Sequence, residues 1–415
     1  MVVEEKKKNI LNQATQLYMV NATVYKSHED FGKKVGHWTI FPLVEKISEL
    51  NVDWVFFLDE ITGLSVEKLI KLLSTYNSSQ EHFIGYALRD SEPTIIHHFA
   101  SNEGNSAVLY PHFAPGFAMS LPLIQKIHSR LSEDFEHAFS IDPKYEIAKF
   151  IWNNGMGIQL QHSENFCIKN KEPHCVSWIE EGLPTCSAVV STSKIFVAVK
   201  TCHKFHENRV KVIKSTWAPE VENLHFFSDK NDHLIPTITL NVENVPNGHC
   251  EKTLSIMKYY LQMKDPLDWL IIVDDDTLLN YRRLLKLLSC YDSSISVALG
   301  ERYGYSVTNN LGYDYITGGG GMAFSLPAVT TLVKNCYCPS IDSPDDMIIG
   351  MCLKKLNIPV THSHLFHQAR PTDYSFDLLK PFKQISFHKH WMIDPYYVYS
   401  TWLKDNMTRY QHVEL

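Results

Sequence analysis

The chain repeats part of its own sequence, and this repeat constrains its fold more than any other feature. Residues 53–79 align with residues 268–294 without a gap, and 13 of the 27 positions are identical. The likeness continues in two shorter pairs of stretches, "GFAMSLP" (116–122) with "GMAFSLP" (321–327) and "SID" (140–142) with "SID" (340–342). Because a period of about 200 residues is far longer than a solenoid repeat, the pattern indicates a duplicated domain.

Each copy has the sequence pattern of an α/β fold. In the second copy, residues 268–274 form a short apolar, β-branched run that is typical of a buried parallel strand. Leucines then recur at helical spacing in residues 280–291. Two further strands are predicted at 194–201 and 223–229, with a helix between them, which gives a βαβ unit.

We therefore predict two tandem α/β domains, at residues 1–170 and 191–415, joined by a cysteine-containing linker at residues 171–190. The first domain is expected to be incomplete, because residue 1 aligns with about residue 216 and the strand predicted at 194–201 has no counterpart. Either this sequence lacks its start or the first copy has lost that strand. We favour the first alternative, since it also explains the charged N-terminus where a signal peptide would have its apolar core.

Composition excludes several classes of protein. The 415 residues are 44% hydrophobic and 20% charged, with a formal net charge of -7, which is ordinary for a globular protein large enough for two cores. No basic stripe is present, so a nucleic-acid partner is not expected. No apolar run approaches the roughly 18 residues that a membrane span needs.

The cysteines and the C-terminal residues point to the secretory pathway. The last four residues, "HVEL" (412–415), resemble the KDEL-type tetrapeptide that retrieves proteins to the lumen of the endoplasmic reticulum. Of nine cysteines, Cys167, Cys175 and Cys186 share one polar segment without a CxxC pair, which favours disulfides over zinc. Three glycosylation sequons, at Asn21, Asn77 and Asn406, are compatible with the same route.

Three consecutive aspartates, Asp274, Asp275 and Asp276, follow the predicted strand at 268–274. In open α/β sheets, ligands bind at the carboxyl ends of the strands. Adjacent carboxylates repel one another, and a Mg²⁺ or Mn²⁺ ion carrying a diphosphate would relieve that repulsion. The alternative is an acidic turn that caps the following helix through Asp276.

Six motifs stand in the order found in the Fringe-like β1,3-glycosyltransferases, and on them the chain resembles that family over nearly its whole length: "AVKTCHKFHENRVKVIKSTWAPE", "HFFSD", "WLIIVDDDT", "TGGGGMAFSLP", "SPDDMIIG" and "LFHQARP". The resemblance implies two tandem Fringe-like domains of the GT-A, Rossmann-like class. It also implies a metal-dependent, inverting hexosyltransferase that uses a UDP-sugar.

The resemblance implies roles for the aspartate triplet. Asp276 is expected on Mn²⁺ (or Mg²⁺), with Asp274 also at the metal and with Asp274 and Asp275 near the ribose and the sugar. The ion would neutralise the UDP leaving group. The second protein ligand of the family is the histidine of a Phe-His pair, which is His367 here. Two nearby histidines, at 362 and 364, leave that assignment open.

The resemblance also implies the catalytic and uridine-binding residues. Asp346 is expected to take the proton of the acceptor hydroxyl, with Asp345 as the other choice. Both acids also fit a helix cap. Thr201 and Asp229 would hold the uridine, and routine turn capping is the alternative for them.

The glycine run at 317–321 contains Gly319 and Gly320, which would let the backbone approach the donor closely. It lacks the GxGxxG spacing of a dinucleotide site, and a plain flexible loop is the alternative. The aromatic residues between 388 and 402 could form a stacking surface for a sugar or a protein acceptor. Such density is more typical of a core, which we favour.

The first copy has lost these features. The triplet has become Asp59, Glu60 and Ile61, the glycine run has become "FAPGF", and the acidic pair aligns with Tyr145 and Glu146. We expect the first domain to be catalytically silent and either to bind the acceptor protein or to stabilise its partner.

The branch of the family that the chain most resembles transfers glucose from UDP-glucose to O-linked fucose on thrombospondin type 1 repeat proteins. The resemblance therefore implies that reaction, in the endoplasmic reticulum. Two alternatives stay open. The chain could transfer another sugar, N-acetylglucosamine or galactose, or it could be a catalytically silent, lectin-like binding protein of quality control.

Overall fold

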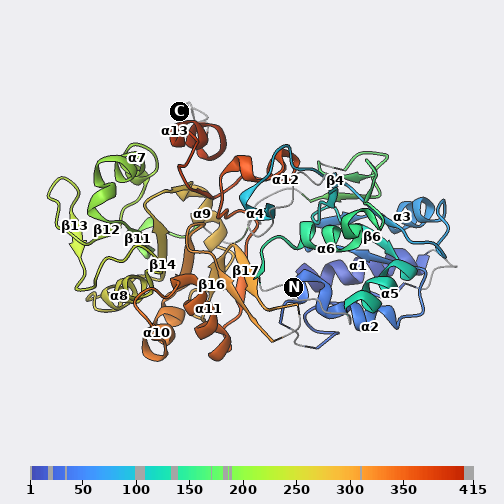
Figure 1. Cartoon of the computed structure of the whole chain (residues 1–415), viewed down its shortest axis with the longest axis horizontal. Coiled ribbons are helices and arrows are strands. Elements are labelled where there is room, and N and C mark those ends of the chain that lie inside the picture. The colour runs from blue at the N-terminus through green and yellow to red at the C-terminus, as the bar shows by residue number, and fades with distance from the viewer. Residues whose placement is uncertain are drawn as a thin grey trace, which may run out of the picture. The chain divides into compact units, whose positions relative to one another are not determined.

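The computed structural model is mixed α/β (Figure 1). It describes residues 2–16, 22–32, 35–98, 108–131, 139–169, 171–180, 186, 189–308 and 311–405. The "HVEL" tail and two of the sequons, at residues 21 and 406, lie outside the described residues. Within them, no helix has the length and apolar character needed to cross a bilayer.

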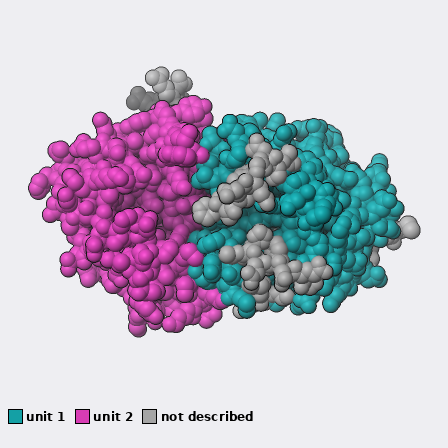
Figure 2. Space-filling model, in the orientation of Figure 1, with its two compact units in different colours: residues 1–182, 302–315, 372–381 teal, residues 183–301, 316–371, 382–415 magenta. Residues whose placement is uncertain are grey.

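The chain divides into two compact units (Figure 2). Unit 1 comprises residues 1–182 with two later segments, 302–315 and 372–381, and unit 2 comprises residues 183–301, 316–371 and 382–415. The two domains predicted from the sequence are each one continuous range, and both later segments fall in the range predicted for the second domain. The two later segments are integral to unit 1, where Trp38 Nε1 donates to Asp314 Oδ1 at 2.9 Å and Tyr86 Oη donates to Asp377 Oδ2 at 3.0 Å.

Unit 2 is built on a seven-stranded sheet in the order β13-β12-β11-β14-β19-β16-β20. The strands are β11 (Ile195–Lys200), β12 (Leu224–Ser228), β13 (Thr237–Thr239), β14 (Trp269–Asp274), β16 (Ala298–Gly300), β19 (Met322–Ser325) and β20 (Val360–His362). Strand β11 runs parallel to both β12 and β14, whereas β19 is antiparallel to β14. The strands predicted at 194–201, 223–229 and 268–274 are therefore confirmed.

Helices cover both faces of this sheet, and β11 is therefore buried on both sides. Ile195, Val197 and Val199 face one apolar cluster, and Phe196 and Ala198 face the other. The first cluster includes residues of α7 (Lys211–Ser215) and α9 (Tyr281–Leu288). The second includes residues of α8 (Cys250–Leu261), α10 (Leu326–Asn335) and α11 (Asp345–Lys355). Unit 2 also contains β15 (Thr277–Leu279), β21 (Ser386–His388) and α13 (Pro395–Val398).

Unit 1 contains a four-stranded sheet in the order β1-β6-β3-β8, which matches β14-β19-β16-β20 of unit 2. Its helices and strands are α1 (Val2–Gln16), α2 (Val44–Ser48), β1 (Trp54–Phe57), β2 (Thr62–Leu64), α3 (Val66–Leu73), β3 (Phe83–Gly85), β4 (Ala87–Leu88), α4 (Ile95–His98), β5 (Tyr110–Pro111), β6 (Phe117–Ser120), α5 (Leu121–Leu131), β7 (Phe139–Ser140), α6 (Pro143–Trp152), β8 (Gln161–His162), β9 (Phe166–Cys167), β10 (Ser177–Ile179), β17 (Arg302–Tyr305) and α12 (Phe376–Leu379). Strand β18 (Tyr313–Ile316) pairs with β17 and ends at the first residue of the next segment of unit 2.

The two sheets share their register as well as their strand order. Trp54 of β1 pairs with Ser120 of β6, and Trp269 of β14 pairs with Ser325 of β19. Each serine hydroxyl also donates to a backbone carbonyl three residues before the neighbouring strand. Ser120 Oγ donates to Gln80 O, and Ser325 Oγ donates to Ile295 O. This likeness is what a duplication would produce. The described part of the unit 1 sheet has no strands in the places of β11, β12 and β13.

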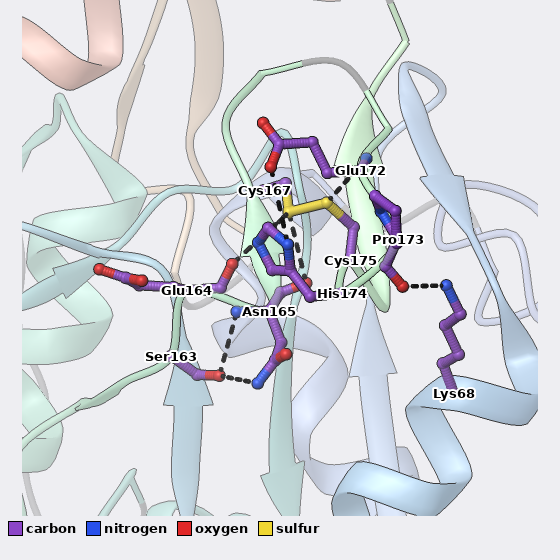
Figure 3. The surroundings of a disulfide bond; sticks show 9 residues. All are labelled: Lys68, Ser163, Glu164, Asn165, Cys167, Glu172, Pro173, His174 and Cys175. Atoms are coloured by element: carbon purple, nitrogen blue, oxygen red, sulfur yellow. Dashed lines mark hydrogen bonds and ion pairs between the residues drawn. A yellow bond between two sulfur atoms is a disulfide. The ribbon is translucent and has the colours of Figure 1, made fainter.

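Eight of the nine cysteines form disulfides, namely Cys167–Cys175, Cys186–Cys290, Cys250–Cys338 and Cys336–Cys352. Figure 3 shows the first of these, beside the loop whose Pro173 carbonyl accepts a hydrogen bond from Lys68 of α3. The prediction of disulfides rather than zinc for this polar segment is confirmed. Cys202 is the free cysteine.

Candidate active site

The predicted donor residues follow three parallel strands of unit 2. Thr201 follows β11, Asp229 follows β12, and Asp274 is the last residue of β14. Because β12, β11 and β14 are neighbours and run the same way, their carboxyl ends meet at one edge of the sheet. The aspartate triplet therefore lies where ligands bind in α/β proteins.

The turn that carries the triplet is held from two sides. Thr277 Oγ1 accepts a hydrogen bond from Asp274 N at 3.1 Å and donates to Gly319 O at 2.8 Å, which ties the turn to the glycine run. On the other side, Lys389 N donates to Asp276 O at 3.1 Å. Pairing of β15 with β21 aligns Thr277 with His388 and so brings a histidine to the triplet.

Asp274, Asp276 and His388 form a candidate metal site, since one ligand atom from each lies within 4.8 Å of the others. His388 Nε2 lies 3.0 Å from Asp276 Oδ1 and 3.7 Å from Asp274 Oδ2. His388 Nδ1 lies 2.9 Å from Gln368 O, so its N–H donates to that carbonyl and Nε2 faces the acids. Two carboxylates and one imidazole are a ligand set that Mn²⁺ accepts, and the residues therefore fit the predicted ion.

Protein cations also relieve the repulsion among the aspartates. Lys200, buried at the end of β11, has its Nζ 3.0 Å from Asp274 Oδ1 and 2.5 Å from Asp345 Oδ2. Arg209 Nη1 lies 2.9 Å from Asp275 Oδ1 and 3.0 Å from Asp276 Oδ2. A metal ion bound here would thus be one of several positive charges at this edge of the sheet.

The surroundings give two aspartates of the triplet different acidities. Burial raises the pKa of Asp275 to about 6, although hydrogen bonds from Arg209 and Thr201 oppose the shift. Burial alone would also raise the pKa of Asp276. There, the hydrogen bond and charge of His388 and the charge of Arg209 outweigh burial and hold the pKa below its ordinary value. Asp276 is therefore the more strongly ionised of the two, as a metal ligand should be.

The acidic pair at the start of α11 is asymmetric. Asp345 is buried, and its Oδ2 accepts from Lys200 Nζ at 2.5 Å and from Thr253 Oγ1 at 2.6 Å, while its Oδ1 accepts from Asp346 N at 3.0 Å. Burial alone would raise the pKa of Asp345, but Lys200 lowers it below the ordinary value. Both oxygens of Asp345 are thus engaged by protein donors, which suits a structural acid.

Asp346 has the properties of a general base. It is partly exposed, and burial together with the charge of Asp345 raises its pKa to about 7. A carboxylate whose pKa lies near the working pH is well suited to accept a proton in the transition state. The geometry therefore favours Asp346 over Asp345 for that role.

The structure does not bring His367 into the metal cluster. His367 Nε2 lies 2.7 Å from Gln384 Oε1, and its ring stacks on Phe387 with centroids 4.8 Å apart. Its assignment as the metal ligand stays a prediction that this arrangement does not favour. The sequence holds three Phe-His pairs, 205–206, 366–367 and 387–388, and only the last places its histidine beside the acids. The repeated dipeptide was the signal that could have made His388 a candidate.

The other predicted donor residues lie around the same edge. Thr201 Oγ1 donates to Asp275 Oδ2 at 2.8 Å, and Asp229 Oδ1 accepts from His203 N at 2.7 Å. Their role at the uridine stays a prediction. Lys200 and Arg209 were not singled out by the sequence, because a lysine that ends an apolar strand and an arginine in a helix have no distinctive pattern.

The glycine run is a fixed turn rather than a loose loop. Gly319 O accepts from Thr277 Oγ1, Gly320 N donates to Gln368 Oε1 at 2.9 Å, and Gly320 O accepts from Ser386 Oγ at 2.5 Å. A Cβ at Gly319 would lie 2.4 Å from two atoms of the His388 ring. Glycine at 319 is therefore required by the position of His388.

Unit 1 provides a natural comparison for this turn. Thr62 Oγ1 accepts from Asp59 N at 2.8 Å and donates to Ala114 O at 2.7 Å, which repeats the contacts of Thr277. Alanine thus occupies the place of Gly319. Glu146, aligned with Asp346, is half-buried and accepts from the backbone at Ile141 and Asp142. These contacts suit a structural role, and catalytic silence of the first copy stays a prediction.

We expect Gly319→Ala to weaken binding of Mn²⁺ by at least about 10-fold, because the methyl group displaces the ring of His388 from the acids. Gly318→Ala is the matched control, since a Cβ there would meet Asp345 and Lys200 only at 3.6 and 3.8 Å, which is ordinary contact. Mn²⁺ binding is measured by electron paramagnetic resonance. Equal affinity in the two variants would contradict the place of His388 in the metal site.

Comparison with known proteins shows the family of the chain. A family model described as Fringe-like matches residues 5–172 and 190–409. The β-1,3-glucosyltransferases of Mus musculus and Homo sapiens are each 47% identical to this chain over 406 residues, which span 96% of this chain and 83% and 81% of those proteins. The β-1,3-N-acetylglucosaminyltransferase lunatic fringe of Mus musculus is 28% identical over 204 residues, 43% of this chain and 54% of that protein. The chain belongs to the Fringe-like family.

Proposed function

We propose that the chain is an inverting, metal-dependent β1,3-glucosyltransferase that transfers glucose from UDP-glucose to O-linked fucose on thrombospondin type 1 repeat proteins. Two relatives named β-1,3-glucosyltransferase match nearly the whole chain at 47% identity and support the sugar and the linkage. The observation that carries the proposal is the candidate metal site of Asp274, Asp276 and His388. The same unit holds an acidic pair in which the pKa of Asp346 is raised to about 7. The fucose acceptor and its protein rest on the sequence resemblance.

Asp274, Asp276 and His388 would hold the divalent ion, which supplies neutralisation of the diphosphate as the sugar bond breaks. Asp346 accepts the proton of the acceptor hydroxyl as that oxygen attacks the anomeric carbon from the face opposite the leaving group. Lys200 keeps Asp345 ionised and in place, and the charge of Asp345 raises the pKa of Asp346. Thr201 and Asp229 would contact the uridine.

The transfer rate should rise with pH through about 7, because Asp346 acts only when ionised and burial with the charge of Asp345 raises its pKa to about 7. Below that pH the carboxyl is protonated and cannot accept the acceptor proton. The measurement is kcat/KM for acceptor at saturating metal and donor, between about pH 5 and pH 9, a range that spans the expected inflection. A flat profile between pH 5 and pH 8 would remove Asp346 from this role.

The donor and the linkage are tested together. The full chain is incubated with Mn²⁺, a free α-fucoside and each of UDP-glucose, UDP-galactose and UDP-N-acetylglucosamine, and the product is analysed by nuclear magnetic resonance. The proposal expects a β1,3-linked glucosyl fucoside with UDP-glucose. Preference for UDP-N-acetylglucosamine would contradict the proposed donor while leaving the reaction class intact.

We further propose that the protein works in the lumen of the endoplasmic reticulum. Four disulfides support an oxidising compartment, and the "HVEL" tail resembles a retrieval signal. Removal of the last four residues should cause secretion from cultured cells, measured in the medium by immunoblotting.

A further inference from the structure

The segment that follows the metal-site histidine presents aromatic side chains to solvent. Trp391 is 64% exposed and Tyr397 is 61% exposed. Our expectation that the aromatic residues between 388 and 402 are mainly core is wrong, because within this range only His388 and Val398 are buried. Met392 and Tyr396 are exposed as well, so four large apolar side chains of one short segment face solvent. Exposed apolar side chains that gather in one patch mark interaction sites.

Trp391 is also held in a fixed position. Arg370 Nη1 donates to Trp391 O at 3.0 Å, and the guanidinium lies 5.2 Å from the centroid of the indole ring. Two residues close to it in the chain, Lys389 and Met392, have left-handed backbone with φ of 75° and 55°. Such conformations are unfavourable for residues with side chains and persist where the surroundings enforce them, often at ligand-binding sites.

The position of Trp391 relative to the metal site is set by the chain itself. His388 and Trp391 are three residues apart, so their Cα atoms are separated by at most about 11 Å. Lys389, between them, bonds through its N–H to Asp276 O. An acceptor sugar whose hydroxyl reaches the anomeric carbon of a metal-bound donor would therefore lie within range of the indole.

We propose that Trp391 is the stacking platform on which the sugar ring of the acceptor binds, with Tyr396 and Tyr397 extending the surface toward the rest of the acceptor. The inference rests on the proposed function and names the subsite that receives the acceptor. An indole suits a pyranose ring because it offers a flat apolar face to the C–H groups of the sugar while the hydroxyls stay in water. Arg370 restrains the indole so that little side-chain entropy is lost on binding.

The test is Trp391→Ala in the full chain, with acceptor KM and kcat measured at saturating UDP-glucose and Mn²⁺ on an α-fucoside. We expect the acceptor KM to rise at least about 10-fold, with a much smaller change in kcat, because the ring contributes binding rather than chemistry. Trp391→Phe should recover most of the loss. Tyr337→Ala is the matched control, since Tyr337 is 73% exposed in the same unit and lies outside the segment that follows His388.

Several outcomes would overturn the platform. An unchanged acceptor KM in Trp391→Ala would do so, as would an equal fall in donor hydrolysis measured without acceptor, because the defect would then lie at the donor site. If the wild type sediments as a dimer, and Trp391→Ala as a monomer with an unchanged acceptor KM, Trp391 is a contact between copies of the chain.

Failure of the proposed function gives a different result. In that case the wild type hydrolyses UDP-sugars but transfers to no fucoside. The platform is then tested by saturation-transfer magnetic resonance with a panel of methyl glycosides. Loss of a wild-type signal in Trp391→Ala supports it, and an unaltered signal, or no signal from any glycoside in the wild type, overturns it.

Discussion

Asp276→Asn should reduce glycosyl transfer on the order of 10³-fold or more, because it removes a charged ligand from the site that neutralises the leaving diphosphate. The binding of Mn²⁺ should weaken in parallel. The melting temperature should fall moderately, because Asp276 is paired with His388 and Arg209, which hold its pKa below the ordinary value and so make its charge stabilising at neutral pH. Initial rates of transfer, Mn²⁺ binding and thermal unfolding are measured on the same preparation.

The duplication supplies a matched control for that variant. Asp59 occupies the place of Asp274 in the first copy, where it is exposed and its Oδ1 accepts from Glu60 N at 2.7 Å. Asp59→Asn makes the same chemical change at an equivalent turn and should leave transfer and Mn²⁺ binding as they are in the wild type. A comparable loss in both variants would mean that the first copy takes part in catalysis.

Asp346→Asn and Asp345→Asn should fail in different ways. Asp346→Asn removes the base and should lower kcat by about 10²- to 10⁴-fold while Mn²⁺ binding persists. Asp345→Asn removes a carboxylate from buried Lys200 and should destabilise the fold by about 3 kcal/mol. Urea unfolding and steady-state kinetics of both variants separate the two roles.

The stability of Asp346→Asn has a predictable dependence on pH. The pKa of Asp346 is raised from 3.8 to about 7, so between those values the folded protein binds a proton that the unfolded chain has released. Wild-type stability therefore falls as pH rises through this window, whereas the amide introduced by the substitution cannot ionise. The variant should gain stability relative to the wild type as the pH rises from about 4 to about 7. Relative stability that is independent of pH would show that the pKa of Asp346 is not perturbed.

Local patterns predicted much of the fold and of the donor edge. The apolar run that ends in Asp274 forms β14, and the strands that precede Thr201 and Asp229 are its parallel neighbours. These features were accessible because short β-branched runs and helical leucine spacing are properties of adjacent residues. The repeat added that the first copy lacks a counterpart of β11, the strand that supplies Lys200, and the described part of the unit 1 sheet has none.

The features that the sequence did not yield depend on contacts between distant segments. His388 reaches the triplet only because β21 pairs with β15, and no local pattern distinguishes it from the histidines of the other two Phe-His pairs. Arg209 approaches the acids from a helix that follows β11. The segments 302–315 and 372–381 belong to unit 1 although both lie in the second half of the sequence, a topology that a repeat alone does not reveal.

Transfer of glucose to fucose on a folded protein can be read directly by intact mass spectrometry. The full chain is incubated with UDP-glucose, Mn²⁺ and a folded thrombospondin type 1 repeat that carries O-linked fucose, with the unfucosylated repeat and Asp276→Asn as controls. We expect the fucosylated repeat to gain the mass of one hexose and both controls to gain nothing. No gain by the fucosylated repeat, or an equal gain by the unfucosylated one, would contradict it.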